Sequence, residues 1–402
     1  MNDLGKGSLP EGWRWVRLGI VCTQDRQIIE PGTATSANRP YLSLEHIESN
    51  TGRILRESAG PTEDEGKSTT FAFDGRHILY GKLRPYLNKV ALPDFQGRCT
   101  TELIPLLPTN TERALLAWAL RRQETVDAAM SGKTGSRMPR ANMDELLCLE
   151  IPLPPLAEQK RIAAILNEQM ATVERTRAAA EAQLVAAKAI PAAYLRTIFN
   201  SPEAQQWNRV SMASISSLVI DGPHVTPFYV PNGIPFLTVR NIVNRRIDLS
   251  EVSYISASDH AEFTRRGKAE RGDILYTKDG TLGIPCVVET DLDFSFFVSV
   301  ALIKLLKDRV DPYFVAFALE SPNMLEQVKL LGAGAGLKHM VLKSIRALDV
   351  PLPALSIQRR IVARLSEQMA TAERTRKALE EQLGTINKLP AALLRRAFSG
   401  EL

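Results

Sequence analysis

The chain has 402 residues, of which 44% are apolar, 24% charged and 6% aromatic. At about 100–200 residues per domain this length predicts two or three domains, and the apolar content excludes a chain that is disordered throughout. Lysine and arginine total 50 against 45 aspartates and glutamates, a formal net charge of +5, so the slight basic excess allows a polyanionic partner without requiring one.

The start of the chain and its cysteines predict a cytoplasmic protein with reduced thiols. The opening MNDLGKGSLPEGWRW has no apolar stretch typical of a signal peptide. No run approaches the roughly 18 apolar residues of a membrane span, so no membrane partner is expected. The cysteines are far apart and form no CxxC pair; they are Cys22, Cys99, Cys148 and Cys286.

Residues 1–150 are predicted to form a first globular domain of mixed α/β (α+β) class. A β-rich run covers residues 77–80 and a helical pattern covers residues 112–122. Turn-forming residues separate these short elements, which is typical of a compact mixed domain.

Residues 151–200 are predicted to form a long spacer helix. Pro152, Pro154 and Pro155 end an extended segment, and no glycine or proline follows before Lys188. At about 1.5 Å per residue, some 35 residues would form a rod of about 50 Å. Spacings of four and three residues predict a coiled-coil seam, formed by Ile162, Leu166, Gln169, Val173, Thr176, Ala180, Leu184 and Ala187.

Residues 201–349 are predicted to form a second globular domain of the same class. β-rich runs cover residues 274–276 and 294–306, and a helix is expected at 311–320. Asp311 is expected to cap this helix and Pro312 to occupy its first position. The GAGAG segment at 332–336 follows a helical pattern instead of a strand, so we interpret it as a loop and not as a phosphate cradle.

Residues 350–402 are predicted to form a second spacer helix, because residues 350–398 repeat residues 151–199. The two segments align without a gap, with 28 identities in 49 pairs, which indicates duplication. The repeated seam consists of Ile361, Leu365, Gln368, Ala372, Thr375, Leu379, Leu383 and Ile386. We predict that the two rods pair antiparallel; the alternative is that each rod packs on its own domain.

The globular domains correspond only weakly, as in PYLSLEHI at 40–47 and PFLTVRNI at 235–242. The helices therefore share one role, whereas the two domains are predicted to perform different tasks of the same kind. Among the five histidines none is spaced from another as zinc ligands are, and no Walker lysine loop, GxSxG or Cys–His nucleophile pattern is present. We predict a binding protein without catalysis or a metal.

Basic and polar loop residues at matching places in both halves predict a nucleic-acid interface. Arginine can bridge two acceptors on guanine and anchor phosphates. Each residue taken singly is better explained as a solvated surface charge, and it is their recurrence at matching places in both halves that favours the interface. The candidates in the first domain are Lys82, Arg84, Lys133, Arg137 and Arg140. Those in the second domain are Arg240, Arg245, Tyr276, Lys278, Thr281, Lys338 and His339.

Several segments are typical of one known family. They are PLPPLAEQKRI at 152–162, PLPALSIQRRI at 351–361, AFSGEL at 397–402, LPEGWRWVRLG at 9–19 and YTKDGTLG at 276–283. On these segments the whole chain resembles the specificity subunit of type I restriction-modification systems. The sequence departs from the pattern at Ile357, where the first copy has Glu158, and at residues 81–84, where GKLR replaces the DGTLG form.

The resemblance implies two target recognition domains, at 1–150 and 201–349, joined by an antiparallel pair of helices. Each domain would read one half of an interrupted, asymmetric double-stranded DNA sequence. The helix pair would dock two modification (methyltransferase) subunits that carry S-adenosylmethionine and flip and methylate adenine. Motor–nuclease subunits, which use ATP and Mg, would join for cleavage, so the chain itself would need no cofactor. A non-catalytic scaffold with protein-binding domains is the main alternative, and a self-sufficient methyltransferase is a third that the missing motifs disfavour.

Overall fold

The structure is a computed structural model that describes residues 9–34, 38–55, 68–135, 137–331 and 339–402. It divides into two compact units, each of which combines one globular domain with parts of both long helices. Unit 1 comprises residues 1–181 and 381–402, and unit 2 comprises residues 182–380. Both units mix helices and sheets, so the predicted α/β class is confirmed.

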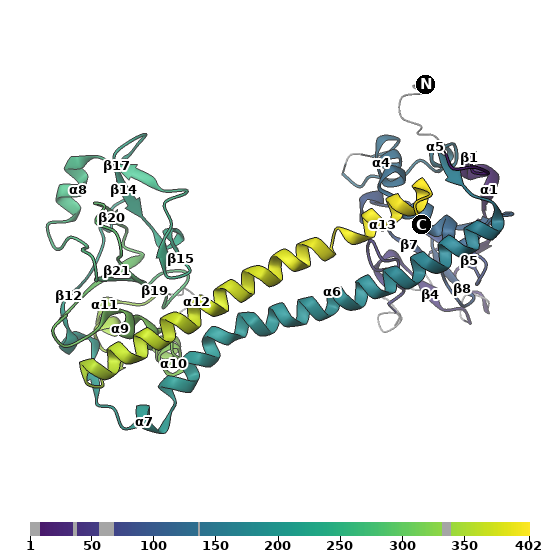
Figure 1. The fold of residues 1–402 in the computed structure, drawn as a ribbon. Coiled ribbons are helices and arrows are strands. Elements are labelled where there is room, and N and C mark those ends of the chain that lie inside the picture. The colour runs from purple at the N-terminus through teal and green to yellow at the C-terminus, as the bar shows by residue number, and fades with distance from the viewer. Residues whose placement is uncertain (1–8, 35–37, 56–67, 136, 332–338) are drawn as a thin grey trace. The chain divides into compact units, whose positions relative to one another are not determined.

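The globular domain of unit 1 contains two four-stranded sheets and a two-stranded ribbon (Figure 1). The sheets have the strand orders β2-β9-β6-β7 and β3-β5-β8-β4, and β1 pairs with β10 in the ribbon. The strands are β1 (Arg14–Arg17), β2 (Cys22–Gln24), β3 (Ile28–Ile29), β4 (Tyr41–Leu42), β5 (Thr70–Phe73), β6 (Ile78–Gly81), β7 (Val90–Ala91), β8 (Gly97–Thr100), β9 (Leu103–Pro108) and β10 (Glu150–Leu153). The helices are α1 (Leu18–Val21), η1 (Leu44–His46), η3 (Pro85–Leu87), α3 (Arg113–Arg121), α4 (Gln123–Ser131) and α5 (Met143–Leu147).

The globular domain of unit 2 repeats this plan, with the sheets β12-β21-β18-β19 and β13-β17-β14-β20 and the ribbon β11-β22. Its strands are β11 (Arg209–Ser211), β12 (Ser216–Asp221), β13 (Tyr229–Val230), β14 (Ile234–Leu237), β15 (Ile242–Val243), β16 (Arg246–Ile247), β17 (Ser253–Ile255), β18 (Ile274–Thr277), β19 (Pro285–Val287), β20 (Ser295–Phe296), β21 (Val300–Leu305) and β22 (Asp349–Pro351). Its helices are α7 (Pro202–Gln205), η4 (Met212–Ile215), η5 (Val239–Asn241), α8 (Ala257–Phe263), α9 (Pro312–Leu319), α10 (Pro322–Leu331) and α11 (Leu342–Arg346). The predicted cap is confirmed, since the Asp311 carboxylate accepts the Tyr313 amide at 2.9 Å and Pro312 begins α9.

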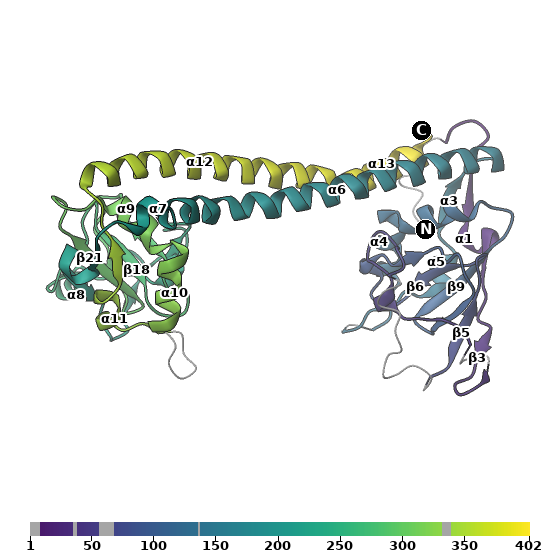
Figure 2. The same cartoon turned by 90° about the horizontal axis from the view of Figure 1, so that it is seen from below.

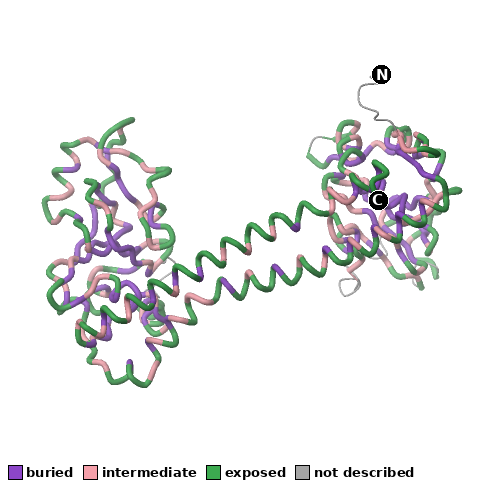
Figure 3. The backbone as a smooth tube through the Cα atoms, in the orientation of Figure 1, coloured by how far each residue is buried: buried purple, intermediate pink, exposed green. Residues whose placement is uncertain are grey.

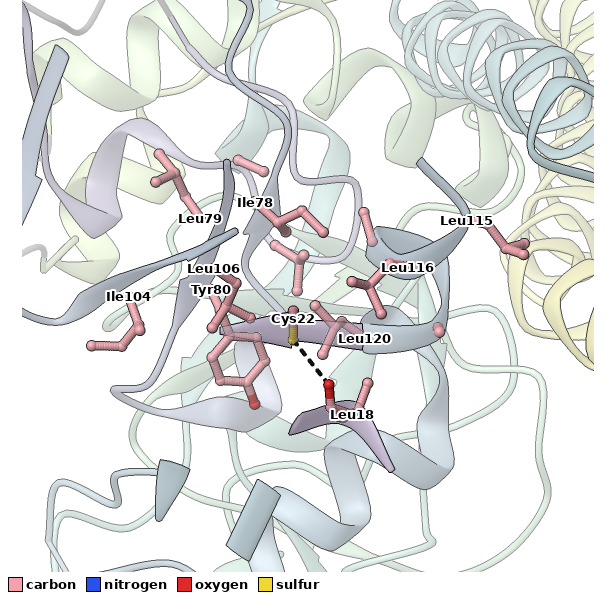
Figure 4. Close-up of a cluster of buried hydrophobic side chains, with 14 of the residues drawn as sticks. Leu18, Cys22, Ile78, Leu79, Tyr80, Ile104, Leu106, Leu115, Leu116 and Leu120 are labelled. Carbon is pink, nitrogen blue, oxygen red and sulfur yellow. Dashed lines mark hydrogen bonds between the residues drawn. The ribbon is translucent and has the colours of Figure 1, made fainter. Parts of the chain in front are cut away.

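The core of unit 1 lies between its first sheet and α3, where leucine and isoleucine side chains meet (Figure 4). Cys22 sits in this core and its thiol donates to the Leu18 carbonyl at 3.3 Å. Burial raises the pKa of Cys22 to about 12, which makes the thiol unreactive. All four cysteines are free, as predicted, and only Cys148 is exposed.

Each long helix is fastened to its own domain by a buried glutamine in its first turn. The helices are α6 (Leu156–Phe199) and α12 (Leu355–Ile386), and a break after α12 precedes α13 (Leu389–Ser399). The Gln159 side chain accepts the Glu112 amide at 2.8 Å and donates to the Pro154 carbonyl at 2.8 Å. Gln358 makes the equivalent bonds in unit 2, so the duplicated helix carries a duplicated anchor.

The two long helices pair antiparallel within each unit. In unit 1 the α6 residues Val173 and Ala180 pack with Ile386 at the end of α12. In unit 2 the end of α6, at Leu195, shares a core with Leu365 near the start of α12. Figures 1 and 2 show the two helices side by side with opposite chain directions.

Most residues of the predicted seam are buried or half-buried, and Figure 3 shows buried positions recurring along both helices. The buried members are Ile162, Leu166, Val173, Ala180, Ala187, Leu365, Ala372 and Ile386. The half-buried members are Gln169, Leu184, Ile361, Gln368, Leu379 and Leu383. Thr176 and Thr375 were wrong: both are exposed, because their hydroxyls donate to carbonyls of their own helices, those of Thr172 and Thr371. The alternative packing also holds in part, since Ile162 belongs to the core of its own domain.

Candidate nucleic-acid interface

In each unit two loops that are distant in sequence meet at the end of the first sheet. After β6 the Lys82 carbonyl accepts the amide of Ala141 at 2.8 Å, and after β18 the Lys278 carbonyl accepts the amide of Met340 at 2.8 Å. Isolated bridges next to these bonds join Leu83 to Arg140 and Asp279 to His339. The backbone therefore repeats, whereas Arg140 of unit 1 is replaced by His339 in unit 2.

Unit 1 presents cations at this place. Arg140 forms a two-pronged pair with the Glu102 carboxylate, at 2.9 and 3.0 Å, and Lys82 lies 3.9 Å from the same carboxylate. Hydrogen bonding to Glu102 raises the pKa of Arg140, so its charge is permanent. One glutamate against two cations leaves a net charge of +1. Arg84 lies beside this group on a backbone with φ of 51° and is exposed.

Unit 2 carries a network of both signs at the same place. The Lys278 side chain is only 2% exposed, and its ammonium lies 3.5 Å from the Asp221 carboxylate and 3.7 Å from that of Asp279. His339 pairs with Asp279 through Nδ1. Arg266 lies 3.9 Å from Asp221, so the cations of Lys278 and Arg266 balance the carboxylates of Asp221 and Asp279.

The sequence-predicted residues fall into three groups. Exposed side chains that can reach a partner belong to Arg84, Lys133, Arg137, Arg240, Thr281 and His339. Lys82, Arg140 and Arg245 are half-buried, and the Arg245 guanidinium is tied to Glu320 beneath the surface. Lys338 lies outside the described residues, as does the GAGAG segment at 332–336.

Two predictions are corrected by burial. Tyr276 is fully buried in the core of unit 2, with its hydroxyl unbonded, and burial raises the pKa of that hydroxyl. Lys278 is held inside by Asp221. Tyr276 lies in β18 and Lys278 directly follows that strand, and neither side chain reaches the protein surface.

Sequence reasoning missed two residues at the edge of the unit 2 network. His224 and Arg266 are 71% and 61% exposed, and both face Asp221, at 3.5 and 3.9 Å. Both residues lie in the globular part of the chain, where the two halves correspond only weakly, and comparison of the halves did not single them out. The one available signal was the cluster of basic residues at 265–268, RRGK.

The described part of the chain shows no sign of a metal centre or of a membrane segment. Its histidine, cysteine, aspartate and glutamate side chains nowhere form a group of three or more that could hold a metal ion. Among the described helices, none is both long enough and apolar enough to cross a membrane.

Two α/β domains of one plan, each carrying a charged loop junction and one long repeated helix, define a duplicated protein. The model of the type I restriction modification DNA specificity domain matches residues 10–184 and again 226–383. The chain belongs to this family.

Individual relatives agree with this assignment. The EcoBI specificity subunit of Escherichia coli is 28% identical over 276 residues, and the EcoKI specificity subunit of strain K12 is 26% identical over 270 residues. Each alignment covers 63% of this chain, and the chain spans 58% of the length of each relative.

Solved structures share the fold over almost the whole chain. A chain from a study of complex assembly and conformational transition of the type I R-M system has a TM-score of 0.79 at 24% identity, covering 99% of this chain and 100% of that one. The HsdS subunit from Thermoanaerobacter tengcongensis has a TM-score of 0.64 at 24% identity, with 99% coverage of both chains. The predicted family and fold are therefore confirmed.

Proposed function

We propose that this chain selects the DNA target of a type I restriction-modification enzyme and catalyses no step itself. Each globular domain reads one half of an interrupted duplex sequence, domain 1 with the loops at 82–84 and 133–140 and domain 2 with the loops at 279–283 and 339. The observation that carries the proposal is the repeated loop junction, which keeps its backbone while its side chains change. Such a junction suits two readers of different half-sites, and hence an asymmetric target.

The chemistry of the exposed loops supports DNA as the partner. Arg84 and Arg137 are exposed and have no acidic partner among the described residues, so they are available to phosphates and guanine edges. Unit 2 adds the exposed side chains of His224 and Arg266, which lie 3.5 and 3.9 Å from the Asp221 carboxylate. The domains therefore differ in the hydrogen-bond donors that they present.

In this proposal the paired helices dock two methyltransferase subunits, which carry S-adenosylmethionine, and motor–nuclease subunits that use ATP and Mg join for cleavage. A cytoplasmic location is part of the proposal, because the target is genomic DNA. The long helices leave much of their surface exposed, as at Val185, which is 70% exposed. That surface is the place where we expect the partner subunits to pack.

The decisive experiment maps methylated bases across the host genome with the chain present and deleted. We expect an interrupted, asymmetric motif to lose its methylation on deletion. An unchanged methylation pattern in a strain that expresses the methyltransferase would contradict the proposal and favour the protein-binding scaffold.

A second experiment tests the loops. The complex reconstituted with the methyltransferase should bind target DNA with an affinity that falls steeply with salt, because phosphate contacts release counterions. Arg137→Gln should cost about 1–3 kcal/mol of binding if this arginine reads a base. Arg76→Gln serves as the matched control, since Arg76 is exposed but committed to Asp74 outside these loops. Equal affinities and sequence preferences for all three proteins would show that this loop does not read DNA.

A further inference from the structure

A cavity of about 810 Å³ lies within unit 1, between the globular domain and the two long helices. Arg121 and Trp118 of α3 line it on one side, Arg177 of α6 on another, and Pro390 and Arg395 of α13 on a third. Its volume is in the range of about 300–1,000 Å³ that is common for small-molecule sites. The break between α12 and α13 lies at its wall, since Asn387 also lines it.

The lining carries more positive than negative charge. Five arginines and three glutamates line the cavity, which gives a net charge of +2. Each of the three glutamates already forms an ion pair with an arginine of the lining. The pairs are Arg53–Glu48 at 3.0 Å, Arg122–Glu124 at 3.0 Å and Arg177–Glu174 at 2.6 Å. Arg121 and Arg395 are left without an acidic partner among the described residues.

Arg121 is the unusual member of this pair. Its side chain is 7% exposed, and its Nε donates to the Val90 carbonyl at 3.0 Å. The guanidinium lies 4.5 Å above the Trp118 ring, and burial lowers the pKa of Arg121 to about 10. Gly52, with φ of +67°, lets the neighbouring loop approach, because a Cβ there would lie 2.0 Å from Nη2 of Arg121. A buried cation without a counter-charge is costly, so the site favours an anion.

The corresponding site in unit 2 contains the carboxylate that the unit 1 site lacks. The repeat aligns Arg121 with Glu320, since Glu112 and Asp311 offer their amides to the two anchoring glutamines. In unit 2 Glu320 pairs with Arg245, which lies 5.7 Å above Phe317, the counterpart of Trp118. Unit 2 therefore holds a closed ion pair over an aromatic ring, whereas unit 1 holds the cation and the ring without the carboxylate.

We propose that the unit 1 cavity binds a small phosphate ester, whose phosphate neutralises Arg121 and Arg395. A phosphate monoester carries about −1.5 to −2 charges at pH 7, which matches the net +2 of the lining. The apolar wall, formed by Leu92, Met170 and Pro390 among others, receives the organic part of the ester. The site is distinct from the loops at 82–84 and 133–140, and a cavity of this volume does not admit a DNA duplex.

The test is isothermal titration of the 402-residue chain with inorganic phosphate, adenosine 5′-monophosphate and adenosine. We expect adenosine 5′-monophosphate to bind more tightly than phosphate, and adenosine not to bind measurably. Arg395→Gln should weaken binding of adenosine 5′-monophosphate by about ten-fold or more, because a charge-assisted contact is lost. Arg396→Gln is the matched control, since Arg396 is exposed, interacts with Glu401 and does not line the cavity.

Three results would overturn the proposal. The first is no binding of either phosphate compound to the folded chain. The second is an equal loss in both arginine variants, which would indicate a general charge effect. The third is displacement of adenosine 5′-monophosphate by duplex DNA together with weaker DNA binding by Arg395→Gln, which would make this place a DNA backbone contact. The first two results would say nothing against methylation that depends on this chain. The proposed function is therefore tested separately, by the genome methylation experiment.

Discussion

Replacing Gln358 by alanine should loosen unit 2 at the point where its domain meets α12. The side chain is fully buried and makes three hydrogen bonds that join three segments. Its oxygen accepts the Asp311 amide at 2.9 Å, and its amide donates to the carbonyls of Pro353 at 2.8 Å and Arg309 at 3.2 Å. At about 0.5–1.5 kcal/mol for each net hydrogen bond, the loss of three bonds amounts to about 1.5–4.5 kcal/mol.

Native-state hydrogen exchange measures this loss locally, which suits a chain of two units that need not unfold in one step. Since about 1.4 kcal/mol corresponds to a factor of ten, amides at 311–319 and 355–362 should exchange roughly 12- to 1,600-fold faster when exchange follows the opening equilibrium. The matching amides at 112–120 and 156–163 in unit 1 should not change. Gln159→Ala should give the reverse pattern, so each unit is the control for the other.

Gln382→Ala controls for the substitution itself, because Gln382 is exposed on the same helix. A change below about three-fold around Gln358 would refute the reasoning about the buried bonds, since the three hydrogen bonds predict about 12-fold or more. Equal acceleration in both units would refute the independence of the two anchors.

Three further predictions concern a buried hydroxyl, a buried carboxylate and the spacer helix. Tyr276→Phe should leave DNA affinity unchanged and keep the free energy of unfolding within about 1 kcal/mol, because the hydroxyl has no partner; weaker DNA binding would contradict its assignment to the core. Burial raises the pKa of Glu320, so the folded state holds its proton more tightly than the unfolded state. The stability of unit 2 should therefore fall as pH rises from about 4.3 to the raised pKa, and Glu320→Gln should flatten that slope in thermal unfolding between pH 4 and 8. Inserting four residues after Ala178 should lengthen α6 by about 6 Å and widen the unread gap in the methylated motif while both half-sites stay the same; an unchanged gap would contradict the spacer role.

The helices could be predicted from sequence because their determinants are local. These determinants are the prolines at 152, 154 and 155, the long interval without glycine and the repeated apolar spacing. Each of them influences the backbone only within a few residues. The same locality explains the correct cap at Asp311. The seam failed only at Thr176 and Thr375, where the hydroxyl turned to its own helix instead of the partner.

The exposure of the candidate interface residues was predicted less well, because the burial of these side chains depends on distant segments. In the sequence, Lys278 resembles an exposed cation of a loop. In the fold, Asp221 of β12 lies 3.5 Å from its ammonium. Arg245 is likewise held partly inside the domain by an ion pair with Glu320, which is 75 residues away in the sequence. No spacing rule connects these partners, and only the folded sheet brings them together.

The duplication explains why the two units share a frame and differ in charge. Positions that fix the backbone have the same residue in both units, as Gln159 and Gln358 show. Each of these glutamines satisfies buried backbone groups that its replacement would leave unpaired. Surface junctions are free to vary, so Arg140 in one unit stands where His339 stands in the other. The exchange of Arg121 for Glu320 goes further, since it reverses the sign of a buried charge. In unit 2 the counter-charge is Arg245 of the same chain, and in unit 1 we propose that it is the phosphate of the bound ester.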